Sequence, residues 1–122
     1  MIEVKGTWHV LAVNDLEKST QYYIDILGFK LEFSVEGWRF LSRGVFRVML
    51  GECPDEVPAS EINNHSYIAY INVEGIDALY AEFKNNGAKF TQEVADKPWD
   101  MREFGIVTPD GHRMMFGEEI ES

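Results

Sequence analysis

The chain has 122 residues, 45% of them hydrophobic, and its 21 acidic and 11 basic residues give a formal net charge of −10. A field of this sign repels phosphate backbones and attracts cations, so nucleic acid is excluded as an expected partner. No apolar run approaches the roughly 18 residues of a membrane span, and no secretory leader is recognisable at the N-terminus. The single cysteine, Cys53, excludes an internal disulfide. We therefore expect a cytoplasmic protein with no membrane partner.

The first half of the chain predicts a strand, a helix and three further strands. The segment "AVNDLEKSTQYYIDILGFKLEF" runs from a strand end through an acidic turn into a helix. Asn14 and Glu17 have the spacing of a capping box, and Gly28 stands where the end of a helix favours a left-handed residue. The stretches "KLEFSVEG", "WRFLSRG" and "VFRVMLGE" then have the composition of short strands.

The second half repeats this order after a linker, "CPDEVPASEINN", which is rich in proline and acids. In "INVEGIDALYAEFKNNGAKFTQ", one apolar helix stripe is formed by Ile76, Leu79, Tyr80 and Phe83. Three strand-like stretches follow, "KFTQEV", "MREFGIV" and "HRMMFGEE", the last two joined by the turn "TPDG".

The repeat predicts an α+β fold in a single domain, residues 1–122, built from two βαβββ modules. The modules span about residues 5–52 and 66–120, with the linker at 53–65. Each module has a sheet with one face under its helix and one open face. Placed edge to edge, the two modules would curve into a mixed sheet around a cleft. The similar stretches "RVMLGEC" and "RMMFGEE" would then be the last strands of equivalent modules.

These residues resemble the vicinal oxygen chelate superfamily, which holds glyoxalase I, extradiol dioxygenases, and fosfomycin and bleomycin resistance proteins. The likeness runs from about Gly6 to Glu118, and "VNDLEKSTQYYIDILGF" is similar to the first strand and helix throughout that superfamily. The stretches "EGWRFLSRG", "EGIDALYAEF" and "KPWDMREFGIVTPDGHRMMF" resemble the bleomycin resistance branch in particular.

The superfamily's metalloenzymes take their metal ligands from the first and last strands of each module. Counting from Val13 and Val73, and aligning "VML" with "MMF", the corresponding positions are Trp8, Ile68, Met49 and Met115. None of these side chains is a ligand for a hard metal ion. We therefore expect no metal or other cofactor, and a binding protein rather than an enzyme.

The three histidines do not suggest a metal site. His9 is adjacent to Trp8, so strand alternation should place it on the opposite face, under the helices. His65 precedes the fifth strand without a counterpart in the other module, and His112 follows a turn glycine, where an exposed or strand-start position is expected.

Strand alternation predicts which side chains line the cleft. If Met49 and Met115 face inward, so do Arg47 and Arg113, two residues earlier. The residues between them should be core; these are Phe46, Val48, Leu50, Met114 and Phe116. On the fifth strand, Tyr70 and Asn72 share the face of Ile68.

The resemblance adds aromatic side chains to this groove. Trp38 matches an aromatic residue of the family's drug-binding groove, and Phe40 and Ser42 share its strand face, although alternation alone does not fix which face that is. Trp99 lies in a hairpin at the rim, where the family closes over a planar ligand, and Arg102 is also placed in the site. Arg102 and Glu103 are further expected to pair across strands as a structural element. Each tryptophan has the alternative of a core or interface role.

The expected function is the sequestration of a bleomycin-like antibiotic, or a related planar ligand, without catalysis. Stacking and desolvation would provide the affinity, and the negative charge of the protein would speed encounter with a cation. Arg47 and Arg113 in the groove oppose a cation, however, so a neutral or anionic aromatic metabolite is equally consistent with these two side chains.

The resemblance also implies a homodimer with grooves at the subunit interface, in which N-terminal strands cross between subunits, and "MIEVKG" is long enough for such an arm. The alternative is a metal-dependent lyase, isomerase or dioxygenase of the same fold. It would use His9, His65 and a carboxylate, Glu118 or Glu52, after a strand bulge. A cleft-bearing regulator or stress protein is a third possibility.

Overall fold

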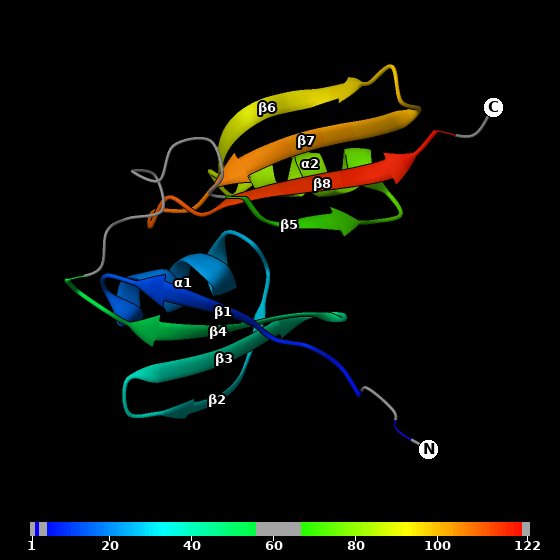
Figure 1. Cartoon of the computed structure of the whole chain (residues 1–122). Coiled ribbons are helices and arrows are strands. Elements are labelled where there is room, and N and C mark those ends of the chain that lie inside the picture. The colour runs from blue at the N-terminus through cyan, green and yellow to red at the C-terminus, as the bar shows by residue number, and fades with distance from the viewer. Residues whose placement is uncertain (1, 3–4, 56–66, 121–122) are drawn as a thin grey trace.

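In the computed structural model, which describes residues 2, 5–55 and 67–120, each half of the chain folds into one βαβββ module (Figure 1). The first module consists of β1 (His9–Val13), α1 (Leu16–Asp25), β2 (Lys30–Val35), β3 (Trp38–Arg43) and β4 (Phe46–Glu52). The second consists of β5 (Tyr67–Asn72), α2 (Ile76–Asn85), β6 (Lys89–Asp96), β7 (Met101–Val107) and β8 (Arg113–Glu119). The predicted α+β class and the repeated modules are confirmed.

The strands form two four-stranded mixed sheets, one per module, where the sequence suggested one curved sheet. Their strand orders are β1-β4-β3-β2 and β5-β8-β7-β6. The first strand of each module is parallel to the last, whereas the other neighbours are antiparallel. The last strands, β4 and β8, therefore occupy the same interior position in their sheets, which explains why their sequences are alike.

One core is shared by both modules. Its buried apolar residues lie on the helix-facing side of each sheet and on the inner faces of the two helices; they are Leu11, Val13, Leu16, Tyr23, Leu27, Phe29, Leu41, Val48, Leu50, Ile76, Phe83, Phe104, Ile106, Met114 and Phe116. The core positions predicted on β4 and β8 are among them, and Phe46 packs against the cluster. Because the helix sides of the modules join in this core, the opposite face of each sheet is left at the surface.

The two helices begin differently. The N-cap of α1 is Asp15 rather than the predicted Asn14, since the Asp15 side chain accepts a hydrogen bond from the backbone N–H of Lys18 at 3.1 Å. The backbone N–H of Asn14 instead donates to Asp110 of the second module. Helix α2 begins after Gly75, whose φ of 86° is left-handed and which provides no side-chain cap.

Other features of the helices match the sequence. Gly28, after α1, has a φ of 74° and therefore adopts the left-handed conformation expected there. The apolar stripe of α2 faces the core: Ile76 and Phe83 are buried, and Leu79 and Tyr80 pack against the cluster.

Candidate ligand-binding site

The face of the first sheet opposite α1 carries a continuous set of aromatic and apolar side chains, here called the first open face. Strand register places on it Trp8, Val10, Phe33, Val35, Trp38, Phe40, Arg47 and Met49. Leu41, which follows Phe40, is fully buried on the helix side. Trp38 and Phe40 therefore lie on the opposite face, a choice that the sequence alternation alone did not decide.

The aromatic rings of the first open face contact one another across three strands. Phe33 of β2 stacks on Phe40 of β3 with ring centroids 4.3 Å apart, and Trp8 meets Phe40 edge-on at 5.4 Å. The Arg47 guanidinium lies 5.0 Å from the centroid of the Trp8 ring, and its Nε donates to the Thr7 carbonyl at 3.1 Å. These two contacts hold the Arg47 side chain against the first open face.

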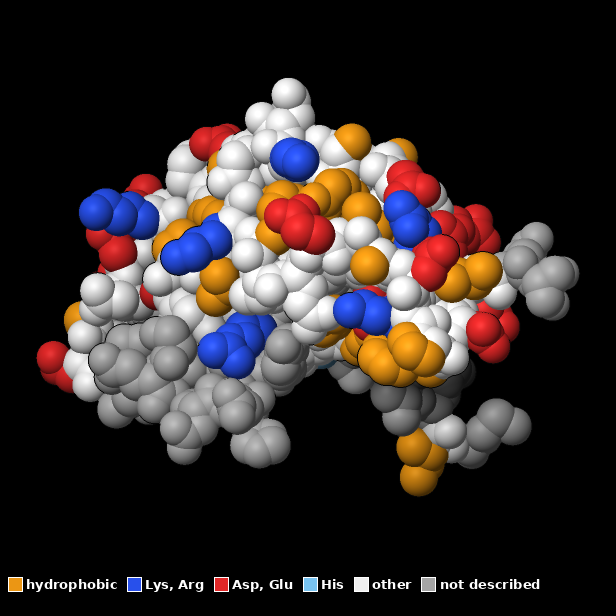
Figure 2. Space-filling view, turned by 90° about the horizontal axis from the view of Figure 1, so that it is seen from above, with side chains coloured by type: hydrophobic (Ala, Val, Ile, Leu, Met, Phe, Trp, Pro, Cys, Tyr) orange, Lys and Arg blue, Asp and Glu red, His pale blue; other side chains and the backbone are white. Residues whose placement is uncertain are grey.

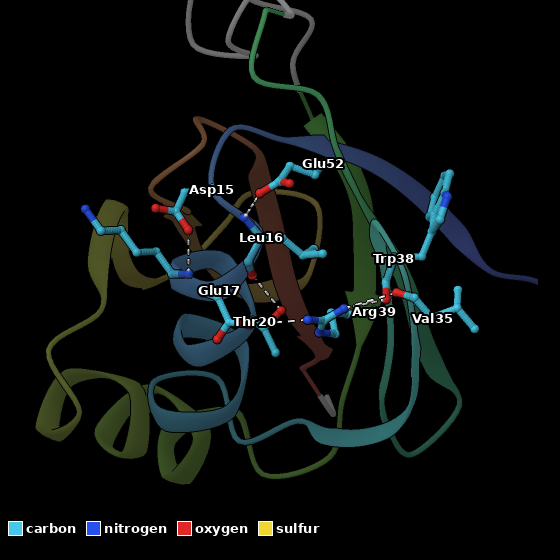
Figure 3. Close-up of polar contacts among 9 residues, drawn as sticks. Asp15, Leu16, Glu17, Thr20, Val35, Trp38, Arg39 and Glu52 are labelled. Carbon is cyan, nitrogen blue, oxygen red and sulfur yellow. Dashed lines mark hydrogen bonds and ion pairs between the residues drawn. The ribbon is translucent and has the colours of Figure 1, made fainter.

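Trp38 is fixed by a close approach to β4. Its ring covers Gly51, its cross-strand partner, so that a Cβ at residue 51 would lie 2.8 Å from the indole. Figure 3 shows Trp38 projecting from the sheet away from α1, whereas the next residue, Arg39, reaches toward Glu17 of α1. Arg39 also donates to the carbonyls of Val35 and Trp38, which ties the β2–β3 hairpin to the helix.

The corresponding face of the second sheet, here called the second open face, combines apolar and polar side chains. Its residues are Ile68, Tyr70, Gln92, Trp99, Glu103, Arg113 and Met115. A pocket of about 500 Å³ lies on this face and is lined by Ile68, Ala69, Tyr70, Gln92 and Met115. Ile68 lies at an irregularity of β5, which lets it line this pocket and also touch the core.

At the centre of the second open face lies Glu103, a carboxylate that the sequence interpretation did not assign to the site. It is only 4% exposed, and its Oε2 accepts hydrogen bonds from the Tyr70 hydroxyl at 2.6 Å and from Trp99 Nε1 at 3.0 Å. Burial, followed by the hydrogen bond to Glu103, raises the pKa of Tyr70, so its hydroxyl remains a donor. The alternation of β7 could have placed Glu103 on this face. Phe104 and Ile106 are core residues, so Glu103, which directly precedes Phe104, should point to the opposite side of the sheet.

Arg102, which was predicted to contact the ligand, lies on the other side of β7. Its guanidinium bonds Asp77 of α2 at 2.9 Å and its cross-strand neighbour Asp96 of β6 at 3.0 Å. Strand alternation explains this placement, because Arg102 and the buried Phe104 lie on the same side of β7. Arg102 and Glu103 each have a structural role, but with separate partners on opposite faces of the sheet. Arg102 bonds Asp77, and Glu103 accepts from Tyr70.

The alternative metal ligands all have other roles or lie outside the described residues. His9 faces the helix side, as alternation predicts, with its ring 5.4 Å from that of Phe46. Glu52 accepts a hydrogen bond from the backbone N–H of Leu16, and Glu118 accepts from those of Gly75 and Ile76, so each carboxylate is bound to the start of a helix. His65 is not among the described residues. In the part of the chain that the structure describes, no three His, Cys, Asp or Glu side chains form a group able to hold a metal ion.

His112 stands directly before β8, the strand-start position of the two that the sequence allowed, and it is only 7% exposed. Burial lowers the pKa of its imidazole, and the Asp110 carboxylate partly opposes this effect. Its Nδ1 is buried without a hydrogen-bond partner among the described residues, so the neutral form is the one that fits.

The cavity between the modules, of about 560 Å³, lies on the helix side. Its lining includes the aromatic residues Phe29, Phe46, Phe83 and Phe116, and also the Arg43–Glu82 ion pair. None of the predicted ligand-binding residues lines it. The open faces are the better candidate because their aromatic rings are accessible.

Exposure of large apolar side chains is concentrated on the open faces. The exposed fractions are 54% for Phe33, 36% for Trp38, 45% for Tyr70 and 61% for Trp99. In the view of Figure 2, hydrophobic side chains reach the surface between acidic and basic ones. Several exposed large apolar side chains on one face mark a surface that binds a ligand or another subunit.

Comparison with known proteins identifies the family. The model of the "Glyoxalase/Bleomycin resistance protein/Dioxygenase superfamily" matches residues 7–116. This chain belongs to that superfamily. Curated bleomycin resistance proteins from Geobacillus stearothermophilus and Staphylococcus aureus are each 34% identical over 125 residues, which covers 92% of this chain and 95% of each relative. The predicted resemblance is thereby confirmed.

Solved structures share the fold of this chain. A bleomycin-binding protein from bleomycin-producing Streptomyces verticillus, complexed with copper(II)-bleomycin, has a TM-score of 0.71 at 21% identity over the whole of both chains. A bleomycin resistance determinant encoded on the transposon Tn5 has a TM-score of 0.79 at 19% identity, covering 95% of this chain and 98% of the other. Within the described residues, no helix is both long and apolar enough to cross a membrane.

Proposed function

We propose that this protein binds and sequesters a bleomycin-like antibiotic or a related planar ligand, without changing it chemically. The observation that carries the proposal is the set of accessible aromatic rings on the two open faces, chiefly Trp38 and Phe33 on the first and Trp99 and Tyr70 on the second. Flat rings of this kind stack on planar ligands, and each stacked ring is worth about 0.5–1.5 kcal/mol beyond the area it buries. The curated relatives named as bleomycin resistance proteins support this ligand class.

We further propose that the site is completed in a homodimer. An open sheet face covers one side of a planar ligand, whereas binding pockets enclose roughly 70–90% of a ligand's surface. The first open face of one subunit opposite the second open face of its partner would supply both walls and bury the exposed rings. An exchanged N-terminal arm is part of this proposal: Ile2 is 97% exposed, while residues 1, 3 and 4 lie outside the described residues.

The net charge of the whole chain favours a cationic or neutral ligand over an anion. Glu103 is a buried carboxylate on the second open face, and on the first sheet Ser42 donates a hydrogen bond to Glu32 at 2.5 Å. Arg47 and Arg113 remain positive charges on the open faces, although the Arg47 guanidinium is occupied by the Trp8 ring and the Thr7 carbonyl. The net charge of −10 adds long-range attraction for a cation. A cytoplasmic location is part of the proposal, in keeping with the single cysteine.

Titration with metal-free bleomycin, followed by tryptophan fluorescence, tests the proposal. We expect saturable quenching at one drug per subunit, weakened at least tenfold in Trp38→Ala and in Trp99→Ala because each loses a stacking surface. Val45→Ala is the control, since Val45 is exposed on the β3–β4 turn and belongs to neither open face. Absence of binding at high micromolar drug, with the protein folded, would contradict the proposed function.

A further inference from the structure

Trp99 is an exposed side chain on a fixed backbone. It lies in the turn between β6 and β7, where the Lys97 N–H bonds the Met101 carbonyl at 2.7 Å and the Asp100 N–H bonds the Lys97 carbonyl at 3.1 Å. Asp100 adopts a φ of 62°, and its carbonyl accepts a hydrogen bond from the Ile120 N–H at 3.0 Å. The turn therefore holds the Cα of Trp99, but the indole itself is 61% exposed and would otherwise be free to rotate.

The indole is held by its hydrogen bond to Glu103. The Nε1–H donates to Glu103 Oε2 at 3.0 Å, so the edge of the ring points to the sheet and the ring stands at the margin of the second open face. A hydrogen bond to a carboxylate is stronger than one between neutral groups. A rotatable ring is thereby restrained before any ligand arrives.

Glu103 is itself held in place from the other side. Tyr70 donates to the same oxygen at 2.6 Å, and its ring lies over Gly117, which pairs with Glu103 across β7 and β8. Any side chain at residue 117 would collide with the Tyr70 hydroxyl, so the glycine is what lets Tyr70 reach the carboxylate. Gly117 thus makes room for Tyr70, Tyr70 holds Glu103, and Glu103 holds Trp99.

We propose that Glu103 is a positioning residue: it holds the Trp99 indole, through Nε1, in the orientation that stacks on a planar ligand. This inference rests on the proposed function, and it adds a residue that acts through Trp99 rather than by touching the ligand. Preorganising the ring removes the cost of ordering it from the binding step.

The first test uses the free protein and needs no ligand. In a Trp8→Phe, Trp38→Phe variant labelled with ¹⁵N at the indole, Trp99 gives the only indole N–H resonance. We expect a downfield, slowly exchanging proton that moves upfield and exchanges at least tenfold faster in Glu103→Ala, with a partial effect in Glu103→Gln, whose amide oxygen still accepts. Glu93→Gln, at an exposed position of β6, is the matched charge control and should leave the resonance unchanged. An unchanged shift and exchange rate in Glu103→Ala would overturn the proposal.

The second test is a double-mutant cycle on the affinity for metal-free bleomycin. Glu103→Ala should weaken binding by about tenfold, and the double variant Trp99→Ala, Glu103→Ala should bind no more weakly than Trp99→Ala alone, within about twofold. Additive losses would show that Glu103 acts independently of Trp99 and would also overturn the proposal. If the wild-type protein does not bind bleomycin, the proposed function fails, and the indole measurement still decides whether Glu103 holds Trp99.

Discussion

Gly51 and Gly117 occupy equivalent positions in β4 and β8, and each lies beneath an aromatic ring from a neighbouring strand. Trp38 of β3 covers Gly51, and Tyr70 of β5 covers Gly117. Neither glycine has a left-handed φ, so the requirement at both positions is for space rather than for backbone freedom. The repeated "G-E" of the two last strands thus seats one ring on each open face.

Replacing Gly117 with alanine should therefore destabilise the protein and displace Tyr70. The added methyl group would meet the Tyr70 side chain, and overpacking of this kind costs about 1–3 kcal/mol of unfolding free energy. Urea denaturation of Gly117→Ala checks the value, and the same change in a Tyr70→Ala background is the control, because the obstructing ring is then absent. An equal loss in both backgrounds would contradict the packing explanation.

Buried His112 should make stability depend on pH. Burial holds its pKa below the ordinary value of about 6.5. As the pH falls below that value, the unfolded chain binds a proton that the folded protein does not, so the free energy of unfolding decreases. It continues to decrease until the pH passes the lowered pKa of the folded state.

We expect His112→Asn to show a smaller loss of unfolding free energy than the wild type between about pH 7.5 and about pH 5.5. Urea denaturation at the two values measures the difference, and the carboxylates and the other histidines are common to both proteins. Parallel losses in the two proteins would show that His112 does not carry this dependence.

The last strand of each module also stabilises a helix of the same module. Glu52 at the end of β4 accepts a hydrogen bond from the first N–H of α1, and Glu118 of β8 accepts two at the start of α2. A carboxylate here satisfies otherwise unpaired N–H groups and interacts favourably with the helix dipole. Helix α1 has Asp15 as a second acceptor, whereas the N-cap of α2 is a glycine.

Glu118→Ala should consequently cost more stability than Glu52→Ala. We expect a loss of about 1–2 kcal/mol for the former and about 0.5–1 kcal/mol for the latter, since Asp15 still caps α1. Thermal or urea unfolding provides the measurement, with Glu119→Ala, an exposed neighbour, as the control that should change little. A larger loss for Glu52→Ala would contradict this account of the caps.

At the scale of elements, the sequence predicts what depends on local periodicity. The apolar stripe of α2 and the alternation of β4 and β8 place Phe83, Val48 and Met114 in the core, because one buried face imposes its period on the chain. The start of α1 was displaced by one residue, to Asp15, because both neighbouring side chains are suitable caps and only the backbone conformation chooses between them.

The candidate site was less predictable, because its contacts join strands distant in sequence. The alternation of β7 was sufficient to place Arg102 with the core residue Phe104, but the family resemblance had directed it to the ligand. The hydrogen bonds of Glu103 depend on Tyr70 and on the β6–β7 turn, and only the pairing of β5, β8 and β7 brings them together.

For the whole molecule, the repeat indicates two modules but not which surfaces they share. The structure joins them through their helix sides, with additional bonds such as Ser19 to Asp110 and Asn86 to the Ile26 carbonyl. The two open faces are thus left for an outside occupant.

We expect sedimentation equilibrium to give twice the mass of the chain at micromolar concentration; a mass equal to one chain would contradict the proposed dimer.

The most direct test of the proposed groove is complementation between Trp38→Ala and Trp99→Ala subunits, measured by calorimetric titration with metal-free bleomycin. Each variant alone should lose high-affinity binding, because both of its grooves lack one ring. In a mixed dimer, one groove combines an intact first open face with the partner's intact second open face. After random subunit exchange, roughly one quarter of the wild-type site density should return at wild-type affinity. No recovery, with subunit exchange demonstrated, would contradict a ligand site shared between the open faces of two subunits.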